Sequence, residues 1–210
     1  MRAERRVPCR GLALLVALAL AAAYQLAGQD AVPTPAPAPA PTAAATTAQS
    51  DNAAAFKEFT VRVEDYLTLH KAIEKKLPAM KNKEELPEMI AAHQQALARM
   101  IREARPHARS GDIFTPAARG AFRHVIRGVF PDPQAAAHAT SRQRDRAKEV
   151  RLRVNGIYPD AVAETTFPPT LLQKLPTLPD ELAYRIVGRD LILVDTKANL
   201  VVDLVHEALP

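Results

Sequence analysis

Two stretches of the chain place mostly apolar residues at alternating intervals of three and four positions. In residues 51–77 these positions hold Phe56, Phe59, Val63, Tyr66, His70, Ile73 and Leu77. In residues 84–108 they hold Leu86, Ile90, His93, Leu97, Met100 and Ala104. Two such positions per heptad are typical of a helix that packs on another helix. Because only a short link containing Pro78 separates the stretches, the pattern predicts an antiparallel helical hairpin.

A third helix is predicted to follow Thr115, because Pro116 then falls in the first turn, where proline is tolerated. Its apolar face would be formed by Ala118, Phe122, Val125 and Val129. The prolines at 131 and 133 break this helix, so the helical part of the domain covers residues 51–131. Residues 132–149 carry almost no apolar stripe and are predicted to form a polar crossing.

In the last part of the chain, residues 150–210, apolar residues recur at every second position. Val150, Leu152 and Val154 alternate with arginines, which predicts a half-buried strand. One helical turn is expected within residues 167–175, and Gly188-Arg189 fits a two-residue hairpin turn. Three strands are predicted over residues 182–187, 190–195 and 200–206.

These elements predict an α+β fold in a single domain over residues 51–210. An N-terminal antiparallel helical hairpin and a third helix would precede a small C-terminal antiparallel β-meander.

The first 31 residues are typical of an export segment. Four arginines precede an uncharged, mostly apolar run over residues 11–27, and Ala21 and Ala23 provide the spacing for a signal-peptidase cut before Tyr24. A Pro/Ala/Thr-rich linker, residues 32–50, follows. We therefore expect a periplasmic or secreted protein. The alternative is a domain outside the cytoplasm, anchored in the inner membrane by an uncleaved 11–27 segment.

The charge is unevenly distributed. The whole chain has a net charge of +5, and residues 99–153 hold 13 basic and 5 acidic residues. Arg119, Arg123 and Arg127 share one face of the third predicted helix and are candidate anion-binding residues, because guanidinium groups suit phosphate and carboxylate. The sequence does not identify a partner, and an anionic envelope component or another protein are the candidates. Nucleic acid is not expected, because export removes the usual target.

Two histidines fall on the helical seams. If Leu77 faces Leu86 in the hairpin, His70 faces His93. Such a pair could be neutral and hydrogen-bonded, could sense pH, or could contribute two ligands to a metal site that would need others. The single cysteine excludes an internal disulfide framework and a cysteine-based zinc cluster.

Catalytic patterns are absent from the sequence. No serine has the glycine-flanked setting of a nucleophile elbow, HExxH is missing, and the chain has only 7 glycines. No catalytic residue and no cofactor is therefore predicted. The sequence favours a non-catalytic binding or scaffolding module over an enzyme. The alternatives are a hydrolase whose site is assembled from scattered polar residues, and a metal or pH sensor that uses His70 and His93.

Two strings in the sequence are distinctive: AHQQALARMIREARPHARSGDIFTP and LPDELAYRIVGRDLILVDTKANLVVDLV. Around them, residues 66–116 and 175–210 resemble segments of a group of exported bacterial proteins with no assigned activity. The resemblance implies export, and it supplies no catalytic residue, cofactor or ligand.

Overall fold

The computed structural model describes residues 43–79, 86–134, 151–159 and 167–210. The predicted export segment lies outside these ranges. So do residues 32–42 of the predicted linker and residues 135–149 of the predicted polar crossing. All described elements belong to one compact unit, Ala40–Pro210.

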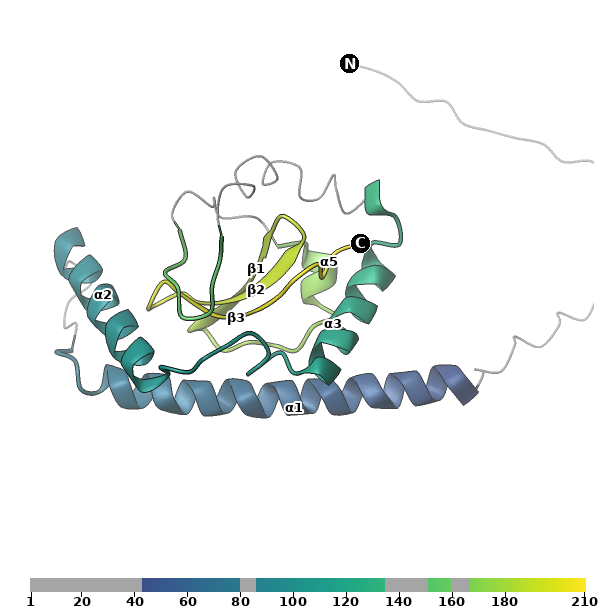
Figure 1. Cartoon of the computed structure of the whole chain (residues 1–210), viewed down its shortest axis with the longest axis horizontal. Helices are drawn as coiled ribbons and strands as arrows, with labels where there is room; N and C mark the ends of the chain where they lie inside the picture. Colours follow the sequence, from purple (N-terminus) through teal and green to yellow (C-terminus); the bar gives the residue numbers. More distant parts are fainter. Residues whose placement is uncertain (1–42, 80–85, 135–150, 160–166) are drawn as a thin grey trace, which may run out of the picture. The chain divides into compact units, whose positions relative to one another are not determined.

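The predicted α+β class is confirmed, with helices first and a small antiparallel sheet last (Figure 1). The helices are α1 (Ala43–Glu74), α2 (Pro87–Ala104), α3 (Pro116–Val129) and the short α5 (Pro169–Leu172). The strands are β1 (Leu182–Val187), β2 (Asp190–Asp195) and β3 (Leu200–Val205). They form one sheet in the order β1-β2-β3, and both neighbouring pairs are antiparallel.

Helix α1 begins earlier than its apolar pattern indicates. It starts at Ala43, whereas the apolar pattern placed the helix within residues 51–77. Residues 43–48 are alanine and threonine without proline, and alanine has the highest helix propensity. The helix ends at Glu74, a few residues before Pro78.

The seam predicted on α1 is its buried face, but its aromatic contacts are with α3, the loop before α3 and the sheet. The Phe59 ring lies 5.2 Å from that of Phe114, 4.9 Å from that of Phe122 and 6.3 Å from that of Tyr184, between centroids. Phe56 meets Phe122 edge to face at 5.1 Å. These rings form the centre of the main core.

Helix α2 is buried only in its second half, where Leu97, Ala98 and Ile101 enter the core. In its first half Met89 and Ile90 are 55% and 46% exposed, and Leu86, just before the helix, is 63% exposed. The apolar seam of α2 therefore continues beyond the part of the helix that α1 covers.

Both faces of the sheet are covered. Leu193 and Val202 belong to the core shared with the helices, whereas Ile192 and Val201 belong to a second cluster with Tyr158. The β1–β2 connection is the predicted two-residue turn, with Gly188 at a φ of 63°. A bulge interrupts the β2–β3 register between Leu193 and Val194.

The prediction of a strand over residues 150–154 is wrong for the described part, residues 151–154, which has no strand pairing. Leu152 and Val154 do pack on the second cluster, so the alternation correctly marked a half-buried segment. Backbone pairing with β3 begins only at Asn155, whose N–H donates to Val201 O at 2.8 Å. Asn155 has a φ of 60°, so the chain turns at the point where the pairing begins.

Candidate functional site

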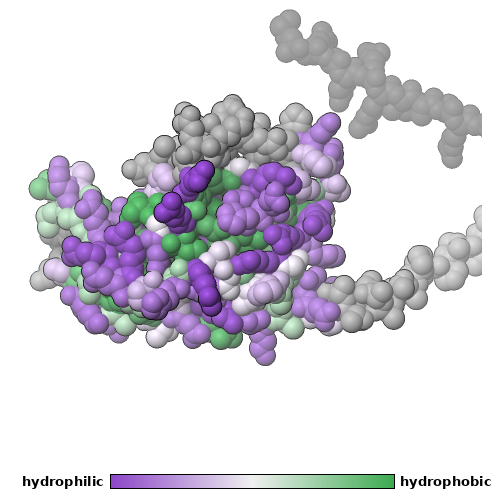
Figure 2. Space-filling view, in the orientation of Figure 1, coloured by the Kyte–Doolittle hydropathy of each residue, from purple (hydrophilic) through white to green (hydrophobic). Residues whose placement is uncertain are grey.

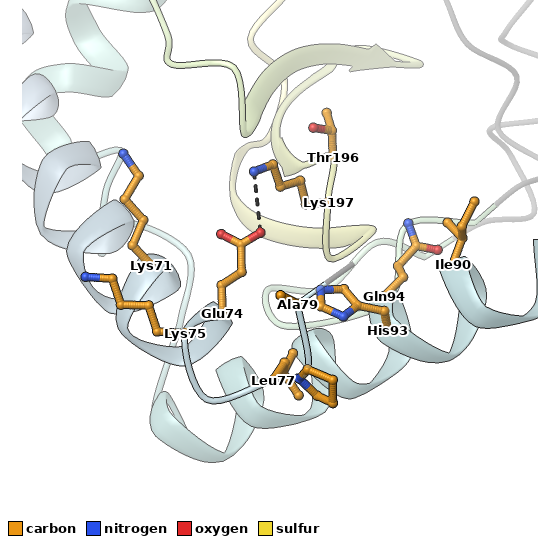
Figure 3. Close-up of a pocket in the computed structure, with 11 residues that line it drawn as sticks. Lys71, Glu74, Lys75, Leu77, Ala79, Ile90, His93, Gln94, Thr196 and Lys197 are labelled. Carbon is orange, nitrogen blue, oxygen red and sulfur yellow. Dashed lines mark hydrogen bonds and ion pairs between the residues drawn. The ribbon is translucent and has the colours of Figure 1, made fainter. Parts of the chain in front are cut away.

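A hollow of about 790 Å³ lies between the end of α1, the first half of α2 and the β2–β3 turn (Figure 3). We call it the α1–α2 hollow. One part of its wall is apolar and includes Leu77, Pro78 and Ile90. The charged groups in its wall are Lys71, Glu74, Lys75 and Lys197. The hollow therefore combines apolar surface with an excess of positive charge.

Within the described residues the first half of α2 is poorly covered, since Met89 and Ile90 are 55% and 46% exposed. A second hollow, of about 300 Å³, is lined by the same residues 77–79 together with Met89, Ala92 and Ala96. His93 borders both hollows. Figure 2 shows apolar atoms at the free end of α2, in agreement with the exposure of Leu86 and Met89.

A buried polar network lies next to the α1–α2 hollow. Tyr66 and His70, one turn apart on α1, both bind Asp195 at the end of β2. The Tyr66 hydroxyl donates to Asp195 Oδ2 at 2.7 Å, and His70 Nδ1 lies 2.6 Å from the same oxygen. Asp195 Oδ1 accepts from the backbone N–H groups of Lys197 and Ala198 at 3.0 and 2.8 Å. The carboxylate is thus fully buried yet accepts at both oxygens.

The network extends to the hollow through Glu74. His70 Nε2 is buried without a hydrogen-bond partner among the described residues, and Glu74 Oε2 lies 3.8 Å from it. The other oxygen of Glu74 lies 3.5 Å from Lys197 Nζ, the contact drawn in Figure 3. His70 itself is fully buried and does not line the hollow. Glu74 therefore connects the buried pair to the hollow.

The electrostatic setting keeps the Tyr66 hydroxyl protonated. Burial raises the pKa of Tyr66, and the negative charge of Asp195 raises it further, although Arg105 opposes this. The Arg105 guanidinium carbon lies 5.1 Å from the centre of the Tyr66 ring. A protonated phenol can donate, and an ionised carboxylate only accepts, so the bond between them has a fixed direction.

The predicted face-to-face pairing of His70 with His93 is wrong. The contacts of His70 are with Tyr66, Glu74 and Asp195. His93 instead borders the two hollows. The hairpin register that would pair the imidazoles places Leu86 opposite Leu77, but Leu86 is 63% exposed. A buried carboxylate is a stronger acceptor for an imidazole N–H than a second neutral imidazole.

The hydroxyl group among the residues that line the hollow is already hydrogen-bonded. Thr196 is the hydroxyl residue among those that line it, and its Oγ1 donates to Glu181 O at 3.1 Å. Within the described ranges, no group of three or more His, Cys, Asp or Glu side chains could hold a metal ion. The groups present can bind an anion or an apolar body by contact.

The three arginines predicted to bind anions have different roles. Arg119 holds the loop before α3, because its Nε donates to Phe114 O at 2.9 Å. Arg123 Nη2 donates to His206 O at 2.8 Å. Arg123 and Arg127 also line a separate hollow with Arg189, which is not among the residues predicted to bind anions.

Neither of the two carboxylates that are buried within the described residues was predicted from the sequence. Besides Asp195, Asp203 on β3 is fully buried and accepts from the backbone N–H groups of Gly111, Ile113 and Phe114 at 2.7–3.2 Å. The available signal was a carboxylate inside or at the end of an apolar strand, as in LVVDLV and DLILVD. Such a residue is rarely buried without several donors.

Comparison of the chain with family models, curated proteins and solved structures gives no match. None of the helices in the described ranges has both the length and the apolar character needed to cross a membrane. The geometry of the α1–α2 hollow and the sequence therefore carry the functional argument.

Proposed function

We propose that this protein is an exported, non-catalytic binding module whose α1–α2 hollow takes a small amphipathic anion. The observation that carries the proposal is the meeting of an apolar wall with three lysines in one hollow of about 790 Å³. That volume falls in the range of roughly 300–1,000 Å³ typical of small-molecule sites.

The charges of the hollow support an anionic ligand. Lys71 Nζ lies 3.7 Å from Glu181 Oε1, and Lys197 Nζ lies 3.5 Å from Glu74 Oε1. These contacts leave Lys75 as the surplus positive charge among the lining residues. Both ion pairs are long and partly exposed, so a ligand carboxylate, sulfonate or phosphate can compete for the lysines.

The apolar part of the ligand would contact Leu77, Pro78 and Ile90. Ile90 is 46% exposed, so its side chain has apolar area left to bury. Burial of apolar area contributes roughly 25 cal/mol per Å², and the ammonium groups would select the anionic end of the ligand.

A binding role fits the buried network better than catalysis does. The His70 imidazole is fully buried, with Nδ1 on Asp195 and Nε2 toward Glu74, so it does not touch a ligand in the hollow. Glu74 is held between His70 and Lys197. The network therefore supports a role in positioning Glu74 and joining α1 to the β2–β3 turn.

The export part of the proposal depends on residues 1–31, whose arginines and apolar run are typical of a signal peptide. Cell fractionation with N-terminal sequencing tests it. A mature protein that begins near Tyr24 in the periplasm or medium supports cleavage, and full-length protein in the membrane fraction supports an anchor. Full-length protein in the soluble cytoplasmic fraction would overturn export.

Binding is tested with 1-anilinonaphthalene-8-sulfonate, an apolar sulfonate whose fluorescence rises in apolar sites. The matched variants are Ile90→Glu in the hollow and Val61→Glu on α1, because Ile90 and Val61 are 46% and 50% exposed and both lie on helices. We expect saturable binding to the wild type, about tenfold weaker binding to Ile90→Glu, and unchanged binding to Val61→Glu. Equal affinity of both variants would overturn the proposal.

A further inference from the structure

The segment after β3 folds back on the β1–β2 turn in a fixed conformation. Glu207, at a φ of 47°, turns the chain, and its N–H donates to Asp190 Oδ1 at 2.9 Å. Leu209 N donates to Arg189 O at 3.1 Å, and the Leu209 side chain is 2% exposed. The backbone of residues 206–209 is therefore held by hydrogen bonds and by a buried side chain.

This fold-back forms a hollow of about 260 Å³ against α3. We call it the arginine hollow, after Arg123, Arg127 and Arg189, which line it together with Glu207. The volume lies below the roughly 300–1,000 Å³ usual for drug-sized ligands, so the hollow suits a small group.

Two of the three guanidinium groups are already oriented by backbone carbonyls. Arg123 Nη2 donates to His206 O at 2.8 Å. Arg189 donates to Leu209 O from Nε at 3.3 Å and from Nη2 at 3.1 Å. A guanidinium has five N–H donors, so each of these arginines keeps donors for a ligand while its position is set. This preorganisation lowers the entropy cost of binding.

The side chains that line the hollow carry an excess of positive charge. Glu207 is the acidic residue among its lining residues, and its Oε1 lies 3.9 Å from Arg189 Nη1, a long and exposed contact. Arg127 follows Arg123 by one helical turn, so both side chains project from the same face of α3. No hydrogen bond or ion pair joins Arg127 to another residue in the described ranges. Arg127 is therefore available to close on a ligand.

From this arrangement we infer that the arginine hollow is a binding site for a phosphate group. A guanidinium fork matches two phosphate oxygens at once, and three forks around one small hollow suit a group with several charged oxygens. The phosphate can come from a soluble phosphate compound or from an anionic lipid headgroup, and the chemistry of recognition is the same. This site is separate from the α1–α2 hollow and does not depend on the function proposed for it.

The test compares two double variants that remove the same number of charges. Arg123→Gln with Arg127→Gln alters the arginine hollow, whereas Arg99→Gln with Arg102→Gln alters exposed arginines on α2. Pyrophosphate binding is measured by titration calorimetry. We expect about tenfold weaker binding for the first double variant and less than a twofold change for the second. Equal weakening in both would show a general charge effect and overturn the site.

A single variant distinguishes loss of binding from loss of folding. Arg127→Gln leaves the bond from Arg123 to His206 O in place, so the fold-back is retained and pyrophosphate binding should still weaken. Vesicles of phosphatidylglycerol identify the source of the phosphate. A lipid headgroup is supported if the wild type sediments with the vesicles and Arg127→Gln abolishes this sedimentation, whereas Arg102→Gln does not. Pyrophosphate binding without sedimentation supports a soluble compound. Absence of both kinds of binding in the wild type would overturn the inference.

Discussion

His70 Nδ1 lies 2.6 Å from Asp195 Oδ2, although 125 positions separate the two residues and neither is exposed to solvent. The contact joins the last turn of α1 to the end of β2. Tyr66 binds the same oxygen, so one carboxylate holds two side chains of the helix. Removal of this carboxylate would leave two buried polar groups without their acceptor.

We expect Asp195→Ala to lower the free energy of unfolding by about 3–5 kcal/mol. The variant leaves the Tyr66 hydroxyl and His70 Nδ1 buried without an acceptor and removes the bonds to Lys197 N and Ala198 N. Urea unfolding followed by circular dichroism measures the loss. Asp180→Ala, at an exposed position, should change stability by less than about 0.5 kcal/mol. A similar small change for Asp195→Ala would contradict the importance of the network.

Alkaline pH should destabilise the fold through two buried tyrosines. Burial raises the pKa of Tyr66 and of Tyr184, and the charge of Asp195 adds to the shift at Tyr66. Near the ordinary tyrosine pKa of about 10, the unfolded chain releases protons that the folded chain keeps. Stability is therefore fully present below about pH 10 and falls as the pH rises above it.

The variant Tyr184→Phe checks this sign. It removes one titrating group, so the fall in stability above about pH 10 should be less steep by up to about 1.4 kcal/mol per pH unit. It also removes the bond to Pro176 O, which costs about 1 kcal/mol at neutral pH. Urea unfolding at a series of pH values gives both quantities. An unchanged slope would mean that Tyr184 ionises in the folded protein.

We expect Asp203→Asn to release the loop before α3. An asparagine amide would place N–H donors opposite the backbone N–H groups of Ile113 and Phe114, which now donate to Asp203 Oδ2 at 2.8 and 2.7 Å. The free energy of unfolding should fall by about 3 kcal/mol, and amide exchange at these two positions should become faster. Asp65→Asn, at an exposed position on α1, is the control and should change neither. Unchanged protection in Asp203→Asn would exclude this role.

Two glycine-to-alanine changes should have opposite signs. Gly188 has a φ of 63° in the β1–β2 turn, which alanine adopts only with strain, so Gly188→Ala should cost about 1 kcal/mol. A Cβ at Gly128, in α3, meets nothing within 4 Å, and alanine favours helix. Gly128→Ala should therefore stabilise the protein by about 0.5–1 kcal/mol. Thermal unfolding under identical conditions would show the two shifts, and shifts of the same sign would contradict this interpretation.

The sheet could be predicted because the residues that specify each strand and turn are close together in the sequence. Strands β1 and β2 match their predicted ranges, since Gly188 fixes a two-residue turn and apolar runs lie on both sides of it. The start of α3 was predictable for the same reason. Thr115 caps the helix by accepting from Ala118 N at 3.3 Å, and Pro116 occupies the first turn.

The partner of each helical face was not predictable. The heptad spacing correctly marked Phe59 and His70 as buried, but a periodic stripe does not say whether a helix, a strand or a loop covers it. The acceptor for His70 lies on a strand far along the sequence. On α2 the stripe includes Ile90, which stays half exposed, because spacing gives the direction of a face and not the length that is covered.

The contact between α1 and Asp195 at the end of β2 also constrains the order in which the chain can fold. During synthesis the N-terminal residues appear first, so α1 is complete long before its main polar partner exists. Until β2 has been made, Tyr66 and His70 have no Asp195 to bind, and their helix face has no sheet to cover it. High sequence separation of this kind slows folding. A chain that stops short of Asp195 should therefore stay unfolded, with its apolar helix face open to chaperones.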